Sequence, residues 1–117
     1  MKILIVDDSA FMRAILKNII LKSKYSDAEL DEAVDGNDAL KKFDQMQPDV
    51  MLLDIIMPGK DGIEVLKEIG SSAKSIAIIS SVDQKEIIEE AKSLGARGYL
   101  VKPYDATEVI AMIDTLA

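Results

Sequence analysis

Three aspartates stand at the ends of two short apolar segments of this 117-residue chain. Asp7 and Asp8 follow the segment Ile3-Leu4-Ile5-Val6, and Asp54 follows Val50-Met51-Leu52-Leu53. If both segments are parallel strands of one sheet, their carboxyl ends lie on the same edge, where open α/β sheets place their ligand sites. Three clustered carboxylates repel one another strongly, so a fold that keeps them together must supply a cation.

Two further polar side chains follow later strand-like segments, Ser80 and Lys102. Together these groups are what phosphoryl transfer to a carboxylate requires. Asp54 is the candidate nucleophile, which would form an acyl phosphate. Asp8 and Asp54 offer hard oxygen ligands to Mg²⁺, and Asp7 would bind the ion through a water molecule. Lys102 would balance the phosphoryl charge, while Ser80 would donate a hydrogen bond to a phosphoryl oxygen.

The charges of such a site predict a switch rather than a turnover centre. Before modification, three carboxylates would face the three positive charges of Mg²⁺ and Lys102. Phosphorylation replaces one carboxylate by a dianionic group, so the site needs new donors, and moving Ser80 with the loop after it would supply them. The alternatives are that the Ser80 hydroxyl bonds only to local backbone at a strand end, or that Ser81 takes its role.

Strand-like and helix-like segments alternate along the chain. Apolar, β-branched runs predict strands, and the run broken by Asp31 and Glu32 is typical of an edge strand. Helical spacing of apolar residues predicts helices between them, with Asp105 and Glu108 at capping-box spacing. The predicted strands are 2–7, 29–34, 50–54, 75–80 and 98–101, and the predicted helices include 12–20, 39–46, 63–69, 87–94 and 109–116. Gly70 and Gly95 stand where helix C-terminal glycines are expected. Five βα units predict a parallel sheet covered on both faces.

Composition excludes several classes of function. The chain has room for one domain, no apolar stretch approaches the roughly 20 residues of a membrane helix, and its start leads into a strand rather than a signal peptide. We therefore expect a cytoplasmic protein. Zero Cys and zero His argue against zinc hydrolases and Ser-His-Asp enzymes. A net charge of -7 argues against nucleic-acid binding.

Four motifs give the chain its resemblance to response-regulator receiver domains, over residues 1–117. They are Val6-Asp7-Asp8-Ser9, Leu53 to Gly62 (Leu-Asp-Ile-Ile-Met-Pro-Gly-Lys-Asp-Gly), Ser80, and Gly98-Tyr99-Leu100-Val101-Lys102-Pro103. The chain is most similar to single-domain chemotaxis regulators of the CheY type. The resemblance implies a flavodoxin-like (βα)5 fold with strand order 2-1-3-4-5 and a cis Lys102-Pro103 bond. It also implies that the backbone carbonyl of Ile56 is a Mg²⁺ ligand and that Tyr99 turns inward when Ser80 engages the phosphoryl group. The alternative for Tyr99 is a strand residue with its hydroxyl in water.

The same resemblance implies a signalling function. A sensor histidine kinase of the CheA type would phosphorylate Asp54, and the modified domain would bind a flagellar or archaellar motor switch or adaptor protein. We expect a monomer that binds neither nucleic acid nor membrane, and whose catalysis is limited to its own phosphorylation and slow dephosphorylation. The alternatives are a phosphorelay shuttle or a receiver cut from a larger regulator; the absence of an output domain before Ala117 favours a single-domain protein.

Residues at specific positions argue against two other functions, a phosphatase and a flavodoxin. A haloacid dehalogenase-like phosphatase needs a second Asp two residues after its nucleophile, and Ile56 or Ala10 stands there. A flavodoxin needs a Ser/Thr/Gly-rich phosphate loop after the first strand, which this chain lacks. Ile56 and Val82 also stand where faster self-dephosphorylating receivers carry polar residues. We therefore predict slow loss of the phosphoryl group and a separate phosphatase.

Overall fold

Strands and helices alternate strictly in the computed structural model, which describes residues 1–117. The strands are parallel and lie in the order β2-β1-β3-β4-β5, which confirms the predicted flavodoxin-like sheet. The elements are β1 (Lys2–Val6), α1 (Ala10–Leu21), β2 (Glu29–Ala33), α2 (Gly36–Met46), β3 (Val50–Leu53), α3 (Gly62–Ile69), β4 (Ile76–Ser80), α4 (Lys85–Ser93), β5 (Ala96–Val101) and α5 (Ala106–Leu116).

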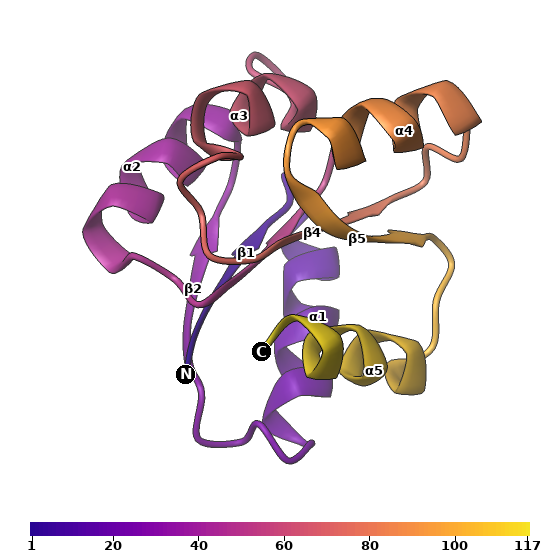
Figure 1. Ribbon diagram of the computed structural model, residues 1–117. Coiled ribbons are helices and arrows are strands. Elements are labelled where there is room, and N and C mark those ends of the chain that lie inside the picture. Colours follow the sequence, from indigo (N-terminus) through magenta and orange to yellow (C-terminus); the bar gives the residue numbers. More distant parts are fainter.

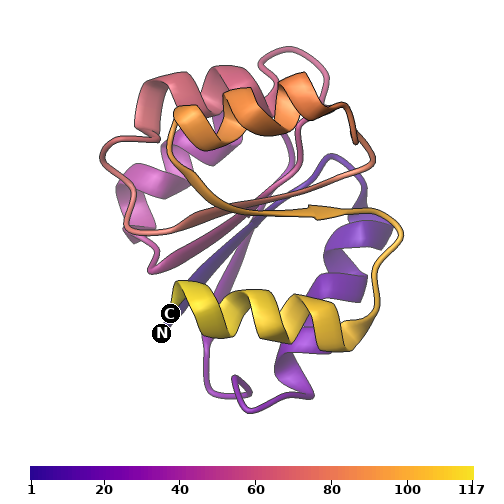
Figure 2. The same ribbon diagram turned by 45° about the vertical axis from the view of Figure 1, so that its right-hand side comes forward.

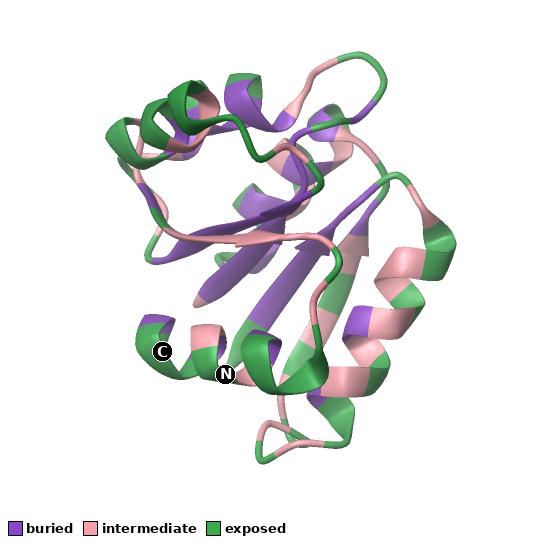
Figure 3. Cartoon of the chain, turned by 90° about the vertical axis from the view of Figure 1, so that its right-hand side faces the viewer, coloured by how far each residue is buried: buried purple, intermediate pink, exposed green.

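The helices form two layers, with α1 and α5 on one face of the sheet and α2, α3 and α4 on the other (Figure 1). Successive strand residues point to opposite faces, so each central strand contributes to both cores. In β1, Ile3 and Ile5 join the core under α1 and α5, whereas Leu4 and Val6 join the core under the other three helices. Apart from Lys2, every residue of β1, β3 and β4 is buried, as Figure 3 shows.

The two outer strands are less buried than the three central ones. β2 pairs only with β1 and exposes Glu29, Asp31 and part of Glu32, which confirms the predicted edge strand. β5 begins at Ala96, two residues before the predicted start. The register explains the difference: Ile76 pairs with Ala96 but Ala77 pairs with Gly98, so one extra residue of β5 is accommodated at a bulge.

Helix ends follow the predicted signals, with one addition. Asp105 and Glu108 form the expected capping box at the start of α5, and Asp61 with Glu64 forms a second one at α3. Gly70 caps α3 in a right-handed conformation, so it is not needed for a positive φ. A Cβ there would lie 1.9 Å from the carbonyl oxygen of Leu94, so Gly70 lets two chain segments approach closely.

The Lys102-Pro103 peptide bond is cis, as predicted. The two termini lie near each other, at the edge of the sheet opposite the aspartates (Figure 2). None of the five helices is long and apolar enough to span a membrane.

Candidate functional site

Strand alternation brings two of the three aspartates to one side of the sheet edge. Asp7 continues the row of Ile3 and Ile5, and Asp54 continues the row of Val50 and Leu52, all facing the α1/α5 core. The backbone N–H of Asp54 donates to the carbonyl oxygen of Val6 at 3.0 Å, which fixes the two strand ends side by side. Asp7 is 3% exposed and Asp54 7% exposed, whereas Asp8 is open to solvent.

Lys102 joins both buried carboxylates. Its ammonium nitrogen lies 3.0 Å from Oδ2 of Asp7 and 3.1 Å from Oδ2 of Asp54. Burial alone would lower the pKa of Lys102, but the hydrogen bond to Asp7 and the charge of Asp54 outweigh burial and raise it. Lys102 is therefore fully cationic at neutral pH and neutralises part of the repulsion between the two acids.

The second oxygen of each buried carboxylate is held by backbone donors. The N–H of Ser9 donates to Oδ1 of Asp7 at 2.9 Å, and the N–H of Ile55 donates to Oδ1 of Asp54 at 2.7 Å. The N–H of Ile56 also points to Oδ1 of Asp54, at 3.4 Å. These bonds orient both side chains so that their Oδ2 atoms face the same space, where Lys102 lies.

The donor set of this cluster fits a hard divalent cation. Oxygens of Asp7, Asp8 and Asp54 all lie within 4.8 Å of one another, and carboxylate oxygens are the ligands that Mg²⁺ prefers. The three acids outnumber Lys102, so a cation between them would relieve the remaining repulsion. Ile56, whose carbonyl is the predicted third protein ligand, lies two residues after Asp54 in the loop after β3, and the residue is 59% exposed.

The loop that carries Asp54 into α3 depends on glycine. Gly62 donates its N–H to the carbonyl oxygen of Ile55 at 2.9 Å. A Cβ at Gly62 would lie 2.3 Å from the backbone oxygen of Asp54 and 2.8 Å from Cα of Ile55, so only glycine fits. Gly59, in the same loop, has a φ of 72°, a conformation that glycine adopts without strain.

Arg13 is a residue of the site that the sequence motifs did not single out for any role. Its Nη1 donates to the backbone carbonyl of Asp7 at 2.8 Å, and its Nε lies 3.0 Å from Glu32 on β2. Burial would raise the pKa of Glu32, but hydrogen bonds from Lys17 and Arg13 lower it. Glu32 therefore stays anionic and holds Arg13 against the turn that presents Asp7.

The hydroxyl groups of the site lie on its other side, around Val82. Ser80 is fully buried at the end of β4, and its Oγ accepts from the N–H of Val82 at 3.3 Å. The Tyr99 hydroxyl donates to the carbonyl oxygen of Val82 at 2.5 Å, so it is not simply hydrated. Burial raises the pKa of Tyr99, and the charges of Asp54 and Asp83 raise it further. Ser81 is exposed.

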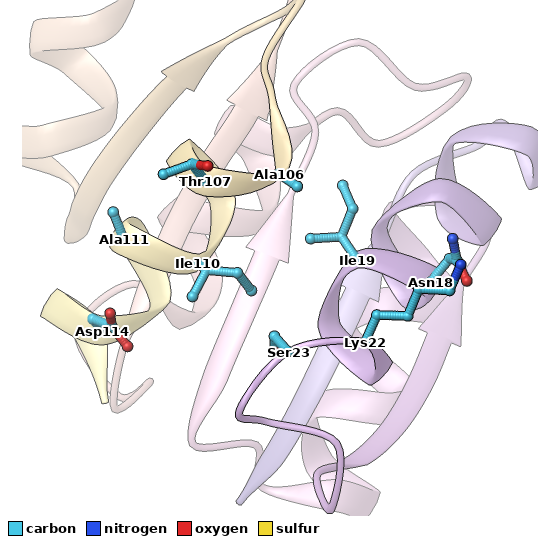
Figure 4. Close-up of a pocket in the computed structure, with 9 residues that line it drawn as sticks. All are labelled: Asn18, Ile19, Lys22, Ser23, Ala106, Thr107, Ile110, Ala111 and Asp114. Atoms are coloured by element: carbon cyan, nitrogen blue, oxygen red, sulfur yellow. The ribbon is translucent and has the colours of Figure 1, made fainter.

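The largest pocket lies away from these residues, between α1 and α5 (Figure 4). Its volume is about 560 Å³, and Ile19 and Ile110 lie on its two facing helices. Lys22 and Asp114 also line it, but it holds no cluster of acids. A smaller pocket of about 490 Å³ adjoins the acidic cluster and includes Lys102 in its wall. The acidic cluster and Lys102 therefore lie at the sheet edge, away from the largest pocket.

A comparison with known protein families agrees with this geometry. The family described as response regulator receiver domain matches residues 3–114. The chain belongs to the response-regulator receiver family. It is thus a receiver domain of the kind found in two-component response regulators, a class of phosphoacceptor switch.

The similar proteins include chemotaxis proteins of nearly the same length as this chain. The chain is 40% identical to chemotaxis protein CheY of Listeria monocytogenes, covering 100% of this chain and 98% of that protein. It is 38% identical to chemotaxis protein CheY of Thermotoga maritima, covering 99% and 97%. The solved structure of chemotaxis protein CheY4 of Vibrio cholerae superposes with a TM-score of 0.89 at 28% identity, covering 99% and 98%.

Proposed function

We propose that this receiver domain is a chemotaxis switch, phosphorylated on Asp54 by a CheA-type histidine kinase and read by a motor switch or motor-adaptor protein. The observation that carries the proposal is the contact of one partly buried ammonium group, Lys102, with both Asp7 and Asp54. A buried carboxylate held between a cation and backbone donors is an oriented acceptor for a phosphoryl group.

The reaction needs little from the protein beyond positioning and charge. An oxygen of Asp54 attacks the phosphorus of a phosphohistidine, the P–O bond of an acyl phosphate forms, and the P–N bond breaks with its electrons passing to the imidazole. When bound by Asp8, Asp54, the Ile56 carbonyl and, through water, Asp7, Mg²⁺ supplies positive charge for the phosphoryl oxygens. Lys102 is placed to supply the rest.

The switch follows from what the modified site lacks. Phosphorylated Asp54 carries one more negative charge and three acceptor oxygens, so it needs additional hydrogen-bond donors. A nearby hydroxyl group can supply one. Ser80 is bonded only weakly, at 3.3 Å to the N–H of Val82. When Ser80 turns to the phosphoryl group, the loop that begins at Ser81 moves with it. Tyr99 then loses its partner at Val82 and turns inward, which changes the surface formed by α4, β5 and α5.

The printed names of the relatives support a motility target, because several are chemotaxis proteins that this chain matches over nearly their whole length. A phosphorelay shuttle is the second candidate, since transfer from and to a histidine would use the same acceptor. The two differ in what the phosphorylated form binds.

A pull-down from native lysate separates these functions. The domain is immobilised with Mg²⁺ alone or with Mg²⁺ and beryllofluoride, which mimics the acyl phosphate, and Asp54→Asn serves as the control that cannot take up beryllofluoride. We expect motor or motor-adaptor proteins to be retained only by the beryllofluoride form. Retention of a kinase or phosphotransfer protein alone, with no state-dependent motor contact, would contradict the motility function and favour the shuttle.

A further inference from the structure

Tyr104 carries a buried hydroxyl that has no role in the proposed phosphoryl transfer. It follows the Lys102-Pro103 turn, and its ring packs against the α1/α5 core. The hydroxyl oxygen is fully covered, yet it has no hydrogen-bond partner. Buried hydroxyl groups are almost always paired, so an orphan of this kind in a folded domain calls for a specific explanation.

The surroundings of Tyr104 narrow the choice of partner. Tyr104 and Lys102 line the same pocket of about 490 Å³, whose other walls are Met12, Ile15, Ser81 and Pro103. Most of this lining is apolar, and Ser81 is exposed. Burial raises the pKa of Tyr104, while the charge of Lys102 lowers it and the charge of Asp7 raises it, so both charges are near.

Lys102 has a donor to spare. An ammonium group carries three N–H donors, and Lys102 uses two of them, on Oδ2 of Asp7 and Oδ2 of Asp54. A divalent cation held by the acidic cluster competes for these carboxylates and repels the ammonium group. Lys102 must then loosen one of its contacts, and it needs another acceptor close by.

We propose that the Tyr104 hydroxyl is this acceptor, a positioning residue that holds the Lys102 ammonium group when a divalent cation occupies the acidic cluster. The inference rests on the proposed Mg²⁺ site, since it concerns what that cation does to Lys102. With Tyr104 in place, the ammonium group stays beside the acceptor carboxylate instead of withdrawing into water. Without the cation, the hydroxyl is unpaired because the bonds to Asp7 and Asp54 hold the ammonium group at the two carboxylates.

The test measures Mg²⁺ affinity by NMR titration of backbone amides, which needs no phosphorylation. Tyr104→Phe removes only the hydroxyl, and it should weaken Mg²⁺ binding about ten- to a hundredfold, as the loss of one hydrogen bond to a charged group predicts. Ser81→Ala is the matched control from the same pocket and should leave the affinity unchanged. In a Lys102→Met background, Tyr104→Phe should have no effect, because the ammonium group it positions is gone.

The outcomes separate this inference from the function on which it rests. If the unsubstituted domain binds no Mg²⁺, the proposed site fails and the role of Tyr104 fails with it. If the unsubstituted domain and Tyr104→Phe bind Mg²⁺ equally well, the role of Tyr104 alone is overturned. Equal weakening by Tyr104→Phe with and without Lys102 would also overturn it, since the effect would then be a general loss of packing.

Discussion

The two sides of the proposed phosphoacceptor site differ in how far they are assembled. On the α1/α5 side, Asp7, Asp54 and Lys102 already contact one another at 3.0 and 3.1 Å, and backbone donors fix the remaining carboxylate oxygens. On the α4 side, the hydroxyls of Ser80 and Tyr99 are engaged with the backbone of Val82 and not with the acids.

This difference indicates a division of work between the two sides. Charged groups that must meet a phosphoryl group benefit from being oriented beforehand, because no reorganisation is then needed during the reaction. A signal, in contrast, requires groups that change partners, and the two hydroxyl bonds to Val82 are neutral bonds of modest net strength. The proposed function therefore assigns phosphoryl acceptance to the charged side and the conformational response to the hydroxyl side.

The largest effect should come from removing the acceptor itself. Asp54→Asn keeps the shape of the side chain but cannot form an acyl phosphate, so labelling from a small acyl phosphate with Mg²⁺ should fall to background. Asp44→Asn, at an exposed position of α2, is the control and should label normally. Persistent labelling of Asp54→Asn would show that the acceptor lies elsewhere.

Removing the cation of the charged side should destabilise the domain. Lys102→Met leaves the carboxylates of Asp7 and Asp54 buried without their partner, and we expect the free energy of unfolding without Mg²⁺ to fall by about 3 kcal/mol. Lys85→Met, at an exposed lysine 3.9 Å from Glu89, should change it by less than about 0.5 kcal/mol. Urea unfolding measures both, and equal small effects would contradict the structural role of Lys102.

The raised pKa of Lys102 determines how the stability loss caused by Lys102→Met depends on pH. A raised folded-state pKa means that the contribution is fully present below the ordinary lysine pKa and is lost only as the pH rises through the folded value. The stability difference between the unsubstituted domain and Lys102→Met should therefore stay constant between about pH 7 and 9. A difference that shrinks across this range would show that Lys102 titrates much lower.

Polar residues beside the acceptor should shorten the lifetime of the phosphoryl group. Ile56 is largely exposed and Val82 partly buried, and neither can orient a water molecule for attack. Replacing them together, Ile56→Asn and Val82→Glu, should shorten the lifetime about tenfold by placing groups that bind and polarise that water. Val34→Glu adds the same charge at the same sheet edge as a control. An unchanged lifetime in the double variant would contradict the prediction that Ile56 and Val82 slow the loss of the phosphoryl group.

The smallest effect should come from the responding side. Tyr99→Phe removes the donor to the Val82 carbonyl, which should cost about 1 kcal/mol of unfolding free energy. The rate of phosphorylation should stay within about twofold of the original, because the charged side is untouched. Stopped-flow phosphorylation and urea unfolding measure the two quantities. A large loss of phosphorylation rate would show that the two sides are not separate.

Strand-end chemistry was predictable from the sequence because it depends on local pattern. Apolar runs that end on Asp7, Asp54 and Lys102 specify both the sheet edge and the face, and the structure brings these residues together. The contact of Arg13 with the Asp7 carbonyl and the orphan hydroxyl of Tyr104 were not predictable. Both depend on how α1 and the turn before α5 pack over the sheet, which no spacing rule specifies.

The partners of the hydroxyl groups show the same limit. The sequence placed Ser80 correctly at the end of one strand and Tyr99 within another, but it left open whether their hydroxyls face water, local backbone or the acids. The structure shows both on Val82. This choice depends on the course of the loop after β4, where hydrogen bonds to the backbone compete closely with other partners.

A crystal structure of the domain with Mg²⁺ and beryllofluoride tests the division of work most directly. The account predicts that Ser80 Oγ leaves the N–H of Val82 for the beryllofluoride, that the Tyr99 hydroxyl leaves the Val82 carbonyl, and that Asp7, Asp54 and Lys102 remain one cluster. A structure with beryllofluoride on Asp54 in which Ser80 and Tyr99 keep both contacts with Val82 would contradict it.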